Sequence, residues 1–264
     1  MKIRTLLMTL VILVVFNSCK KDVHLFCIKG NGTSITRSVQ LDSFNSIDLE
    51  TSAIVYIKEG EQNATISGDE VIVESILESS TLEGEQWNIK NNRCVKGNKN
   101  ETTVITITLP YISRLNLSGS GSVQMLEYFY NVNNLNANVS GSGNMILLLD
   151  SVGSLNSVVS GSGNLDVSCA YSEINNLTVS GSGKVYMKGT GKDEEIRISG
   201  SGKVNAYNFV CKEAEVDVSG SGSAMISVLE YLNVNISGSG KVKYIGEPSI
   251  DVSISGSGSL ENAN

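Results

Sequence analysis

The sequence predicts an all-β fold, a right-handed parallel β-helix (solenoid) with about 18–22 residues per coil and Ser-Gly-Ser-Gly corners. Apolar and polar residues alternate on both sides of this tetrapeptide, and a period of two indicates strands. Glycine is frequent, with 26 residues, whereas proline occurs twice, which excludes collagen-like and proline-rich chains. The tetrapeptide itself occurs eight times at spacings of 18 to 22 residues, starting at Ser118, Ser140, Ser160, Ser180, Ser199, Ser219, Ser237 and Ser255.

The repeats place the corners of the solenoid. Around the motif at Ser180, the residues Leu177, Val179, Val185 and Met187 have the phase of an inward face, and both motif glycines share that phase. A tight corner leaves no room inside for a Cβ, and glycine accepts dihedral angles closed to other residues. The two serines then face outward in two ladders, and we interpret them as structural because no base accompanies them.

The variable coil length favours the right-handed β-helix over related solenoids. A left-handed hexapeptide helix requires a strict six-residue period, and the calcium-binding roll requires a nine-residue period. The sequence has neither period, whereas loops on one side of a right-handed coil can absorb the difference between 18 and 22 residues.

The part before residue 118 is predicted to continue the same architecture with degenerate coils, since terminal repeats are atypical. Residues 46–57 show the strand alternation, with Ala53 where a motif glycine would stand, and residues 64–69 repeat it. Residues 71–82 fit either a strand or a short helix. Residues 102–110 predict a strand that ends at Pro110.

The first residues have the pattern of a bacterial lipoprotein leader. Lys2 and Arg4 precede an apolar run that closes at Asn17-Ser18-Cys19, and this run is too short to span a bilayer comfortably. We therefore expect a signal peptide over residues 1–18, acylation of Cys19 that anchors the chain in a membrane, a tether over residues 19–35, and one domain over residues 36–264. An ordinary cleaved leader is the alternative.

Export would place the other four cysteines in an oxidising compartment, where disulfides persist. Four cysteines allow three pairings. Cys27 and Cys94 both lie outside the regular repeats and are the preferred pair. Cys169 and Cys211 stand at different offsets in repeats that are not neighbours, which predicts two buried free thiols.

Charge and composition argue against several functions. The formal net charge is −7, and −9 without the leader (18 − 27), so nucleic acid is a poor partner. The single histidine, His24, lies in the tether, and Asp166, Asp217 and Asp251 occupy different offsets, so the sequence shows no catalytic cluster, cofactor motif or metal constellation. Asp217 aligns with Arg197 of the preceding coil, which predicts an ion pair between coils.

One outward patch is a candidate ligand surface. Counting from the motifs, its members stack in columns on two successive coils, and Lys241 and Lys243 continue two of the columns. Tyrosine rings beside lysine and asparagine donors can contact sugar rings or an anionic polysaccharide. The alternative is a solvated strand face whose lysines prevent association between edges. The six residues are Lys184, Tyr186, Lys188, Lys203, Asn205 and Tyr207.

The chain resembles a known family. Phe44-Asn45-Ser46-Ile47, the stretch from Thr106 to Pro110 and above all the tandem Ser-Gly-Ser-Gly coils are similar to the putative auto-transporter adhesin head GIN domain, over about residues 36–262. The resemblance implies a β-helical surface adhesin and brings no catalytic or binding residues with it. One departure is that the sequence ends at Asn264 without the C-terminal membrane barrel of an autotransporter, so that lipid anchoring would replace it.

The sequence therefore predicts a non-catalytic, lipid-anchored protein of the cell envelope, in the outer membrane and exposed at the cell surface, that binds glycans or proteins on host or bacterial surfaces. A periplasm-facing scaffold lipoprotein, which would associate through its open end coil or a flat face, is the alternative. A polysaccharide-active enzyme ranks below both, because the required carboxylates are absent.

Overall fold

The structure is a computed structural model that describes residues 27–91, 95–96 and 102–264. The expected leader over residues 1–18, the lipidation residue Cys19, His24 and Cys94 lie outside the described residues. The interpretations that rest on them therefore stay predictions. Among the described residues, no helix is both long and apolar enough to cross a membrane.

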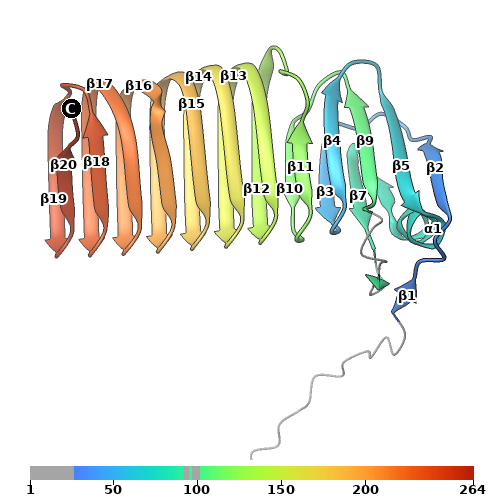
Figure 1. The fold of residues 1–264 in the computed structure, drawn as a ribbon. Coiled ribbons are helices and arrows are strands. Elements are labelled where there is room, and N and C mark those ends of the chain that lie inside the picture. The colour runs from blue at the N-terminus through green and yellow to red at the C-terminus, as the bar shows by residue number, and fades with distance from the viewer. Residues whose placement is uncertain (1–26, 92–94, 97–101) are drawn as a thin grey trace, which may run out of the picture.

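The molecule is a β-solenoid, which confirms the predicted fold class. Strand makes up 71% of the chain and helix 4%, and stacked parallel coils form about 7 turns. In each coil the chain rises from one corner, bends at the far side and descends to the next corner, so that the coils form a row of arches (Figure 1). The strands of the regular coils are β12 (Val132–Gly141), β13 (Asn144–Gly161), β14 (Asn164–Gly181), β15 (Lys184–Gly200), β16 (Lys203–Gly220) and β17 (Ser223–Gly238).

Equivalent motif residues stack directly on one another. Ser160 pairs in register with Ser180, and Ser180 pairs with Ser199. At the corners, backbone hydrogen bonds join the coils, for example from the Ser182 N–H to the Gly161 carbonyl at 2.8 Å. The repeat of the motif therefore fixes the register at the corners, whereas register shifts occur farther along β14, β15 and β16.

The two glycines of each corner differ, which corrects the expectation that both face inward. Gly183 is buried, and a Cβ built there would lie 2.5 Å from a Val159 methyl carbon. Gly181 is exposed and has a φ of +112°, and the corresponding glycines from Gly141 to Gly256 share this positive φ. The left-handed backbone turns the chain at the first glycine, so the period of two is interrupted there.

The core is a set of inward columns that run along the solenoid. Leu177, Val179, Ile196 and Ile198 are all buried, and each pairs in register with an apolar residue of the next coil. Cys169 and Cys211 belong to this interior as free, buried thiols, as predicted. Each coil stacks its apolar residues on those of the next coil, so apolar surface is buried between neighbouring coils. This burial is the source of stability in a solenoid.

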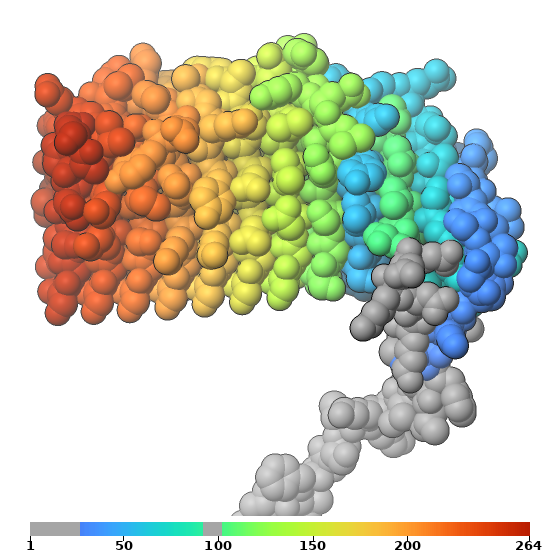
Figure 2. Space-filling view, viewed as in Figure 1, coloured from blue at the N-terminus to red at the C-terminus, as the bar shows by residue number. Residues whose placement is uncertain are grey.

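At the C-terminal end, β18 (Lys241–Ile245) pairs with β17 on one side and with β20 (Ser259–Asn262) on the other, whereas β19 (Ser249–Gly256) pairs with β17. β19 and β20 form the last coil of the described residues, which is covered on one side only. Every residue of β19 is exposed. This coil forms the flat red end of the molecule in Figure 2.

The N-terminal part departs from the prediction of degenerate parallel coils. Residues 46–59 do form a coil, and Ala53 stands beside Gly121 as expected from its place in the pattern. The coil consists of β3 (Ser46–Glu50) and β4 (Ile54–Glu59), which pair with β10 (Arg114–Leu117) and β11 (Ser122–Met125) on one side and with β7 (Gln86–Lys90) and β9 (Val104–Leu109) on the other. β9 confirms the strand that ends before Pro110.

Antiparallel strands and a helix then close this end. β5 (Asn63–Asp69) runs antiparallel to β9 and to β2 (Ser34–Val39), and β6 (Thr81–Glu83) forms an antiparallel pair with β7. The ambiguous segment is the helix α1 (Glu70–Ser79), whose N-cap Asp69 accepts a hydrogen bond from the Val71 N–H at 3.0 Å. α1 buries Val73 and Ile76 and lies at the end opposite to the C-terminus (Figure 1).

The segment after residue 26 is attached to the domain. β1 (Ile28–Lys29) pairs with β8 (Val95–Lys96), and the Gly32 N–H donates to the Asp69 carboxylate at 2.7 Å. The expected boundary at residue 36 therefore falls inside β2. Cys27 is disulfide-bonded. The Cys27–Cys94 pairing stays a prediction, because Cys94 lies outside the described residues.

Candidate functional site

The predicted ligand patch lies on the rising arms of β15 and β16. Lys184 pairs with Lys203, and Tyr186 pairs with Asn205, as the motif count predicts. One additional residue in β16 then shifts the register. Lys188 therefore pairs with Asn208, whereas the motif count predicted that it would pair with Tyr207. The patch is therefore a ladder only up to Tyr186 and Asn205.

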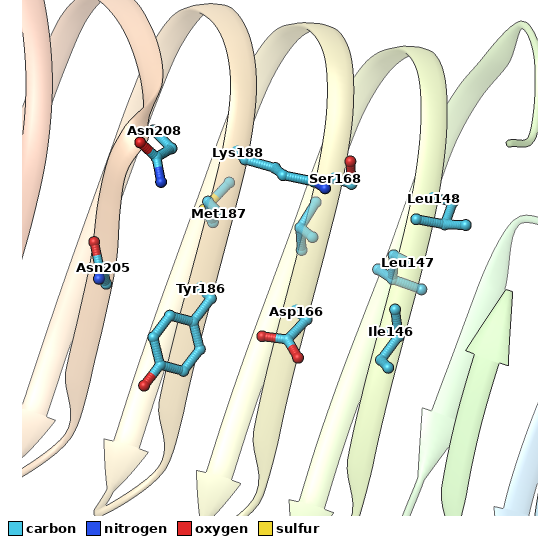
Figure 3. Close-up of a pocket in the computed structure, with 11 residues that line it drawn as sticks. Ile146, Leu147, Leu148, Asp166, Ser168, Tyr186, Met187, Lys188, Asn205 and Asn208 are labelled. Carbon is cyan, nitrogen blue, oxygen red and sulfur yellow. The ribbon is translucent and has the colours of Figure 1, made fainter.

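A groove of about 330 Å³ runs across four coils beside this ladder. Three of the six predicted residues line it: Tyr186, Lys188 and Asn205. Lys184, Lys203 and Tyr207 are not among the lining residues. Figure 3 shows the side chains that β13, β14, β15 and β16 contribute to the groove, which is lined by Ile146, Leu147, Leu148, Asp166, Val167, Ser168, Tyr186, Met187, Lys188, Asn205 and Asn208.

The lower row of the groove has four different side chains in register. Ile146, Asp166, Tyr186 and Asn205 are successive register partners on neighbouring parallel strands. Neighbouring strands lie about 4.8 Å apart, so an apolar, an acidic, an aromatic and an amide group follow one another over about 15 Å. Tyr186 leaves 48% of its surface exposed, so its ring is free to contact a ligand.

The upper row is more polar. Leu148, Ser168, Lys188 and Asn208 are register partners in the same way. The Lys188 side chain extends across the neighbouring coil toward Ser168 (Figure 3). Ser168 also shares a hydrogen bond of 3.0 Å with the hydroxyl of Tyr128, which comes from the loop before β12. This bond ties Tyr128 to the upper row, although Tyr128 is not itself a lining residue of the groove.

Partial burial influences the one acid of the groove. The pKa of Asp166 is raised above its usual value because burial removes water from the carboxylate. Asp166 is the only carboxylate among the lining residues, so the pair of carboxyl groups that glycoside hydrolysis uses is not present in the groove. Its chemistry is that of hydrogen bonding: a carboxylate, two amides, a hydroxyl and an ammonium group surround apolar side chains and a tyrosine ring.

The more distant lysines of the predicted columns have ion-pair partners. Lys243 lies 3.1 Å and Lys241 lies 3.7 Å from the Glu261 carboxylate. The predicted pair between coils is present too, because Arg197 and Asp217 are register partners with a nitrogen to oxygen distance of 3.8 Å.

Sequence reasoning missed half of the polar lining, namely Asp166, Ser168 and Asn208. A signal for Asp166 was available, because it stands three residues after its motif glycine, as Tyr186 does after Gly183 and Asn205 after Gly202. Asn208 could not be found by counting, since the additional residue in β16 changes its phase.

A second hollow of about 320 Å³ lies on the descending arms and is acidic. Its lining includes Ile174, Asp193, Glu195, Glu213 and Glu215. No group of three or more His, Cys, Asp or Glu residues in the described part of the chain has the geometry of a metal site. This hollow also contains an aromatic ring, Tyr231, and amide groups, but no lysine or arginine lines it. The first groove combines a tyrosine ring with an ammonium group and a single carboxylate, and we therefore take it as the candidate ligand site.

Comparisons with known proteins agree on the architecture. A family model described as "Putative auto-transporter adhesin, head GIN domain" matches residues 43–248. A solved structure of a putative lipid binding protein, from Parabacteroides distasonis, is 25% identical with a TM-score of 0.80, and the match covers 90% of this chain and 99% of that one.

Two further solved structures are of putative adhesins. The one from Parabacteroides merdae is 21% identical with a TM-score of 0.82 and coverages of 90% and 99%. The one from Parabacteroides distasonis is 18% identical with a TM-score of 0.81 and coverages of 89% and 99%. At these identities the two structures support the fold alone. No curated protein matches this chain significantly.

Proposed function

Because the chain belongs to the putative auto-transporter adhesin head GIN domain family, we propose that it is a non-catalytic adhesin of the cell envelope that binds glycans in the groove around Tyr186. The observation that carries this proposal is the register ladder Asp166–Tyr186–Asn205, which sets a half-exposed aromatic ring between a carboxylate and an amide. Sugar rings present C–H faces that contact aromatic rings and hydroxyls that bind such polar groups.

The size of the groove sets the size of the ligand. The lining residues come from four adjacent strands, so at about 4.8 Å per strand the groove is about 15 Å wide along the solenoid axis. This length suits a short oligosaccharide segment. The lysine and the single carboxylate would favour a glycan with both hydroxyl and anionic groups, bound at Lys188.

Anchoring is part of the proposal and rests on the sequence. An acyl chain on Cys19 would hold the protein at a membrane, and the segment after residue 26 joins the domain at the end that carries α1. The groove lies on the side of the solenoid, so it would stay accessible beside the membrane. The alternative is a scaffold lipoprotein that faces the periplasm.

A polysaccharide-active enzyme is a weaker candidate, because the groove supplies one carboxylate only. Lipid binding, the property after which the 25% identical protein is named, is a further candidate for the same groove, since Ile146 and Leu148 give it an apolar part. The polar lining residues, which include Asp166, Lys188 and Asn205, favour a glycan over a lipid.

Two measurements test this function. Protease and antibody accessibility on intact cells should show the protein at the surface, whereas protection until the outer membrane is breached would support the periplasmic scaffold. A panel of glycans, phospholipid vesicles and polysaccharide substrates should then show saturable glycan binding without turnover. Binding to vesicles alone, or release of reducing ends, would reject the proposed function.

A further inference from the structure

The last coil exposes side chains that every earlier coil buries. Ile250, Val252 and Ile254 of β19 are register partners of Leu232, Val234 and Ile236. Val234 is fully buried, whereas Val252 is 46% exposed, and the two neighbouring pairs show the same contrast. The inward columns of the core thus continue to the end face of the solenoid, where no further coil covers them in the described part of the chain.

The backbone of this coil is also paired on one side only. Within residues 102–264, β19 pairs with β17 alone and β20 with β18 alone. An open edge of this kind, with a regular strand and exposed apolar side chains, is a template for the addition of another strand. Among the described residues of the N-terminal end, the edge strand β2 also pairs on one side only, but its exposed side chains are polar and Arg37 forms an ion pair with Glu74 of α1.

We propose that the C-terminal end coil is an interface between two copies of this chain, which stack end to end about a two-fold axis through Val252. This proposal is independent of the glycan-binding groove. Because the exposed apolar row lies at one end of the described residues, stacking of two such ends about a two-fold axis gives a closed dimer and not a fibre. A copy approaching with its N-terminal end would present the polar side chains of β2 and the helix α1 instead of an apolar row.

The sequence of β19 is complementary to itself in this arrangement. Antiparallel pairing centred on Val252 places Ile250 opposite Ile254 of the partner subunit, so the apolar residues of both copies meet inside. The same register places Asp251 opposite Ser253 of the partner subunit, where the serine hydroxyl can donate to the carboxylate. Like charges are therefore not brought together across β19.

The size of the end face suits a weak, reversible dimer. The eight residues of β19 extend over about 26 Å, and two sheets about 10 Å apart with their outer side chains make the face about 20 Å wide. Each copy would bury about 500 Å², and a total of about 1,000 Å² is near the lower limit for a specific interface. Backbone hydrogen bonds along β19 would add to this contact.

Sedimentation of the purified chain tests the proposal. We expect a monomer–dimer equilibrium over concentrations from about 1 to 500 μM, because the dissociation constant of an interface of this size should fall within this range. Val252→Lys places two ammonium groups at the axis and should weaken the dimer at least tenfold. Ile174→Lys is the matched control, because Ile174 is an aliphatic residue with 43% exposure on the descending face, away from the end coil.

A cross-link identifies the axis independently of any loss of folding. In the proposed dimer, a cysteine at position 252 lies beside the same cysteine of the second copy. Val252→Cys should therefore form a disulfide-linked dimer under mild oxidation, and Ile174→Cys should not. A chain that stays monomeric over the whole range would overturn the proposal. So would a dimer that Val252→Lys leaves unchanged, or one in which Val252→Cys fails to cross-link.

Discussion

Glu194 lies inside the solenoid next to Asn175, whose amide donates to one carboxylate oxygen at 3.4 Å, while the other buried oxygen has no hydrogen-bond partner. The two residues occupy an inward column between Leu155 and Ala214. Glu194 is 4% exposed, and burial raises its pKa from 4.5 to about 8. The folded protein therefore favours the protonated form of this acid.

The stability of the protein should fall as the pH rises from about 4.5 to about 8. Between these values the folded state holds a proton on Glu194 that the unfolded state has lost, so each rise in pH favours unfolding. Above pH 8 both states are ionised and the loss is complete, on the order of a few kcal/mol.

Glu194→Gln should remove most of this dependence, because the amide keeps the shape and does not titrate. Urea denaturation at pH 5, 7 and 9 measures the effect, with Glu215→Gln as the control on the surface of the neighbouring coil. Equal pH dependence in the Glu194→Gln variant and the unchanged chain would show that another group is responsible.

The corner glycines should tolerate substitution far less than the serines between them. A Cβ at Gly181 would meet the Gly161 carbonyl oxygen at 2.8 Å with the backbone at positive φ, so Gly181→Ala should cost about 1–3 kcal/mol in free energy of unfolding. Ser182 is exposed, so Ser182→Ala should change it by less than about 0.5 kcal/mol. Thermal unfolding followed by circular dichroism compares the two, and a larger loss with Ser182→Ala would reject the structural role given to the corner glycine.

The repeats made the solenoid predictable because each motif carries the same corner and the same inward phase. The phase of the first glycine was not predictable from alternation, since the positive φ at positions such as Gly181 interrupts the period of two. The sequence left α1 open between a strand and a short helix, because two kinds of periodicity fit its short apolar run. The antiparallel pairing of the strands around it was missed, because that segment has no motif.

The candidate site was predicted only where the register follows the count from the motif. Tyr186 and Asn205 obey it, whereas the additional residue in β16 moves Tyr207 out of the ladder and brings Asn208 beside Lys188. Tyr128 could not be found from the repeats, since it lies in the loop before β12 and reaches Ser168 through the fold.

The cysteines should separate into two classes by accessibility. We expect Cys27 to be linked to Cys94, and a disulfide that closes a loop of this length stabilises by about 2–4 kcal/mol. Burial raises the pKa of Cys169 to about 11, and Cys211 is buried too, so both should resist alkylation until the protein unfolds. Peptide mapping without reduction, before and after denaturation, measures this. A link between Cys27 and any other cysteine, or rapid labelling of Cys169 in the native protein, would contradict it.

Two tyrosines that the sequence placed in one patch should differ in their effect on glycan binding. Tyr186 lines the groove between Asp166 and Asn205, whereas Tyr207 lies at the register shift outside the lining. Tyr186→Ala should therefore weaken glycan binding by about 1–3 kcal/mol, the range for loss of a central aromatic contact, and Tyr207→Ala should leave it within about 0.5 kcal/mol.

Asp166→Asn adds a test of the hydrogen-bonding role. The amide keeps one acceptor and removes the charge, so binding of neutral glycans should weaken, while anionic glycans near Lys188 should lose less or gain affinity. Titration calorimetry with the same glycan and each variant measures these differences, and circular dichroism checks the fold. Equal affinities for the Tyr186→Ala and Tyr207→Ala variants would place the ligand elsewhere on the solenoid, because only one of these side chains reaches the groove.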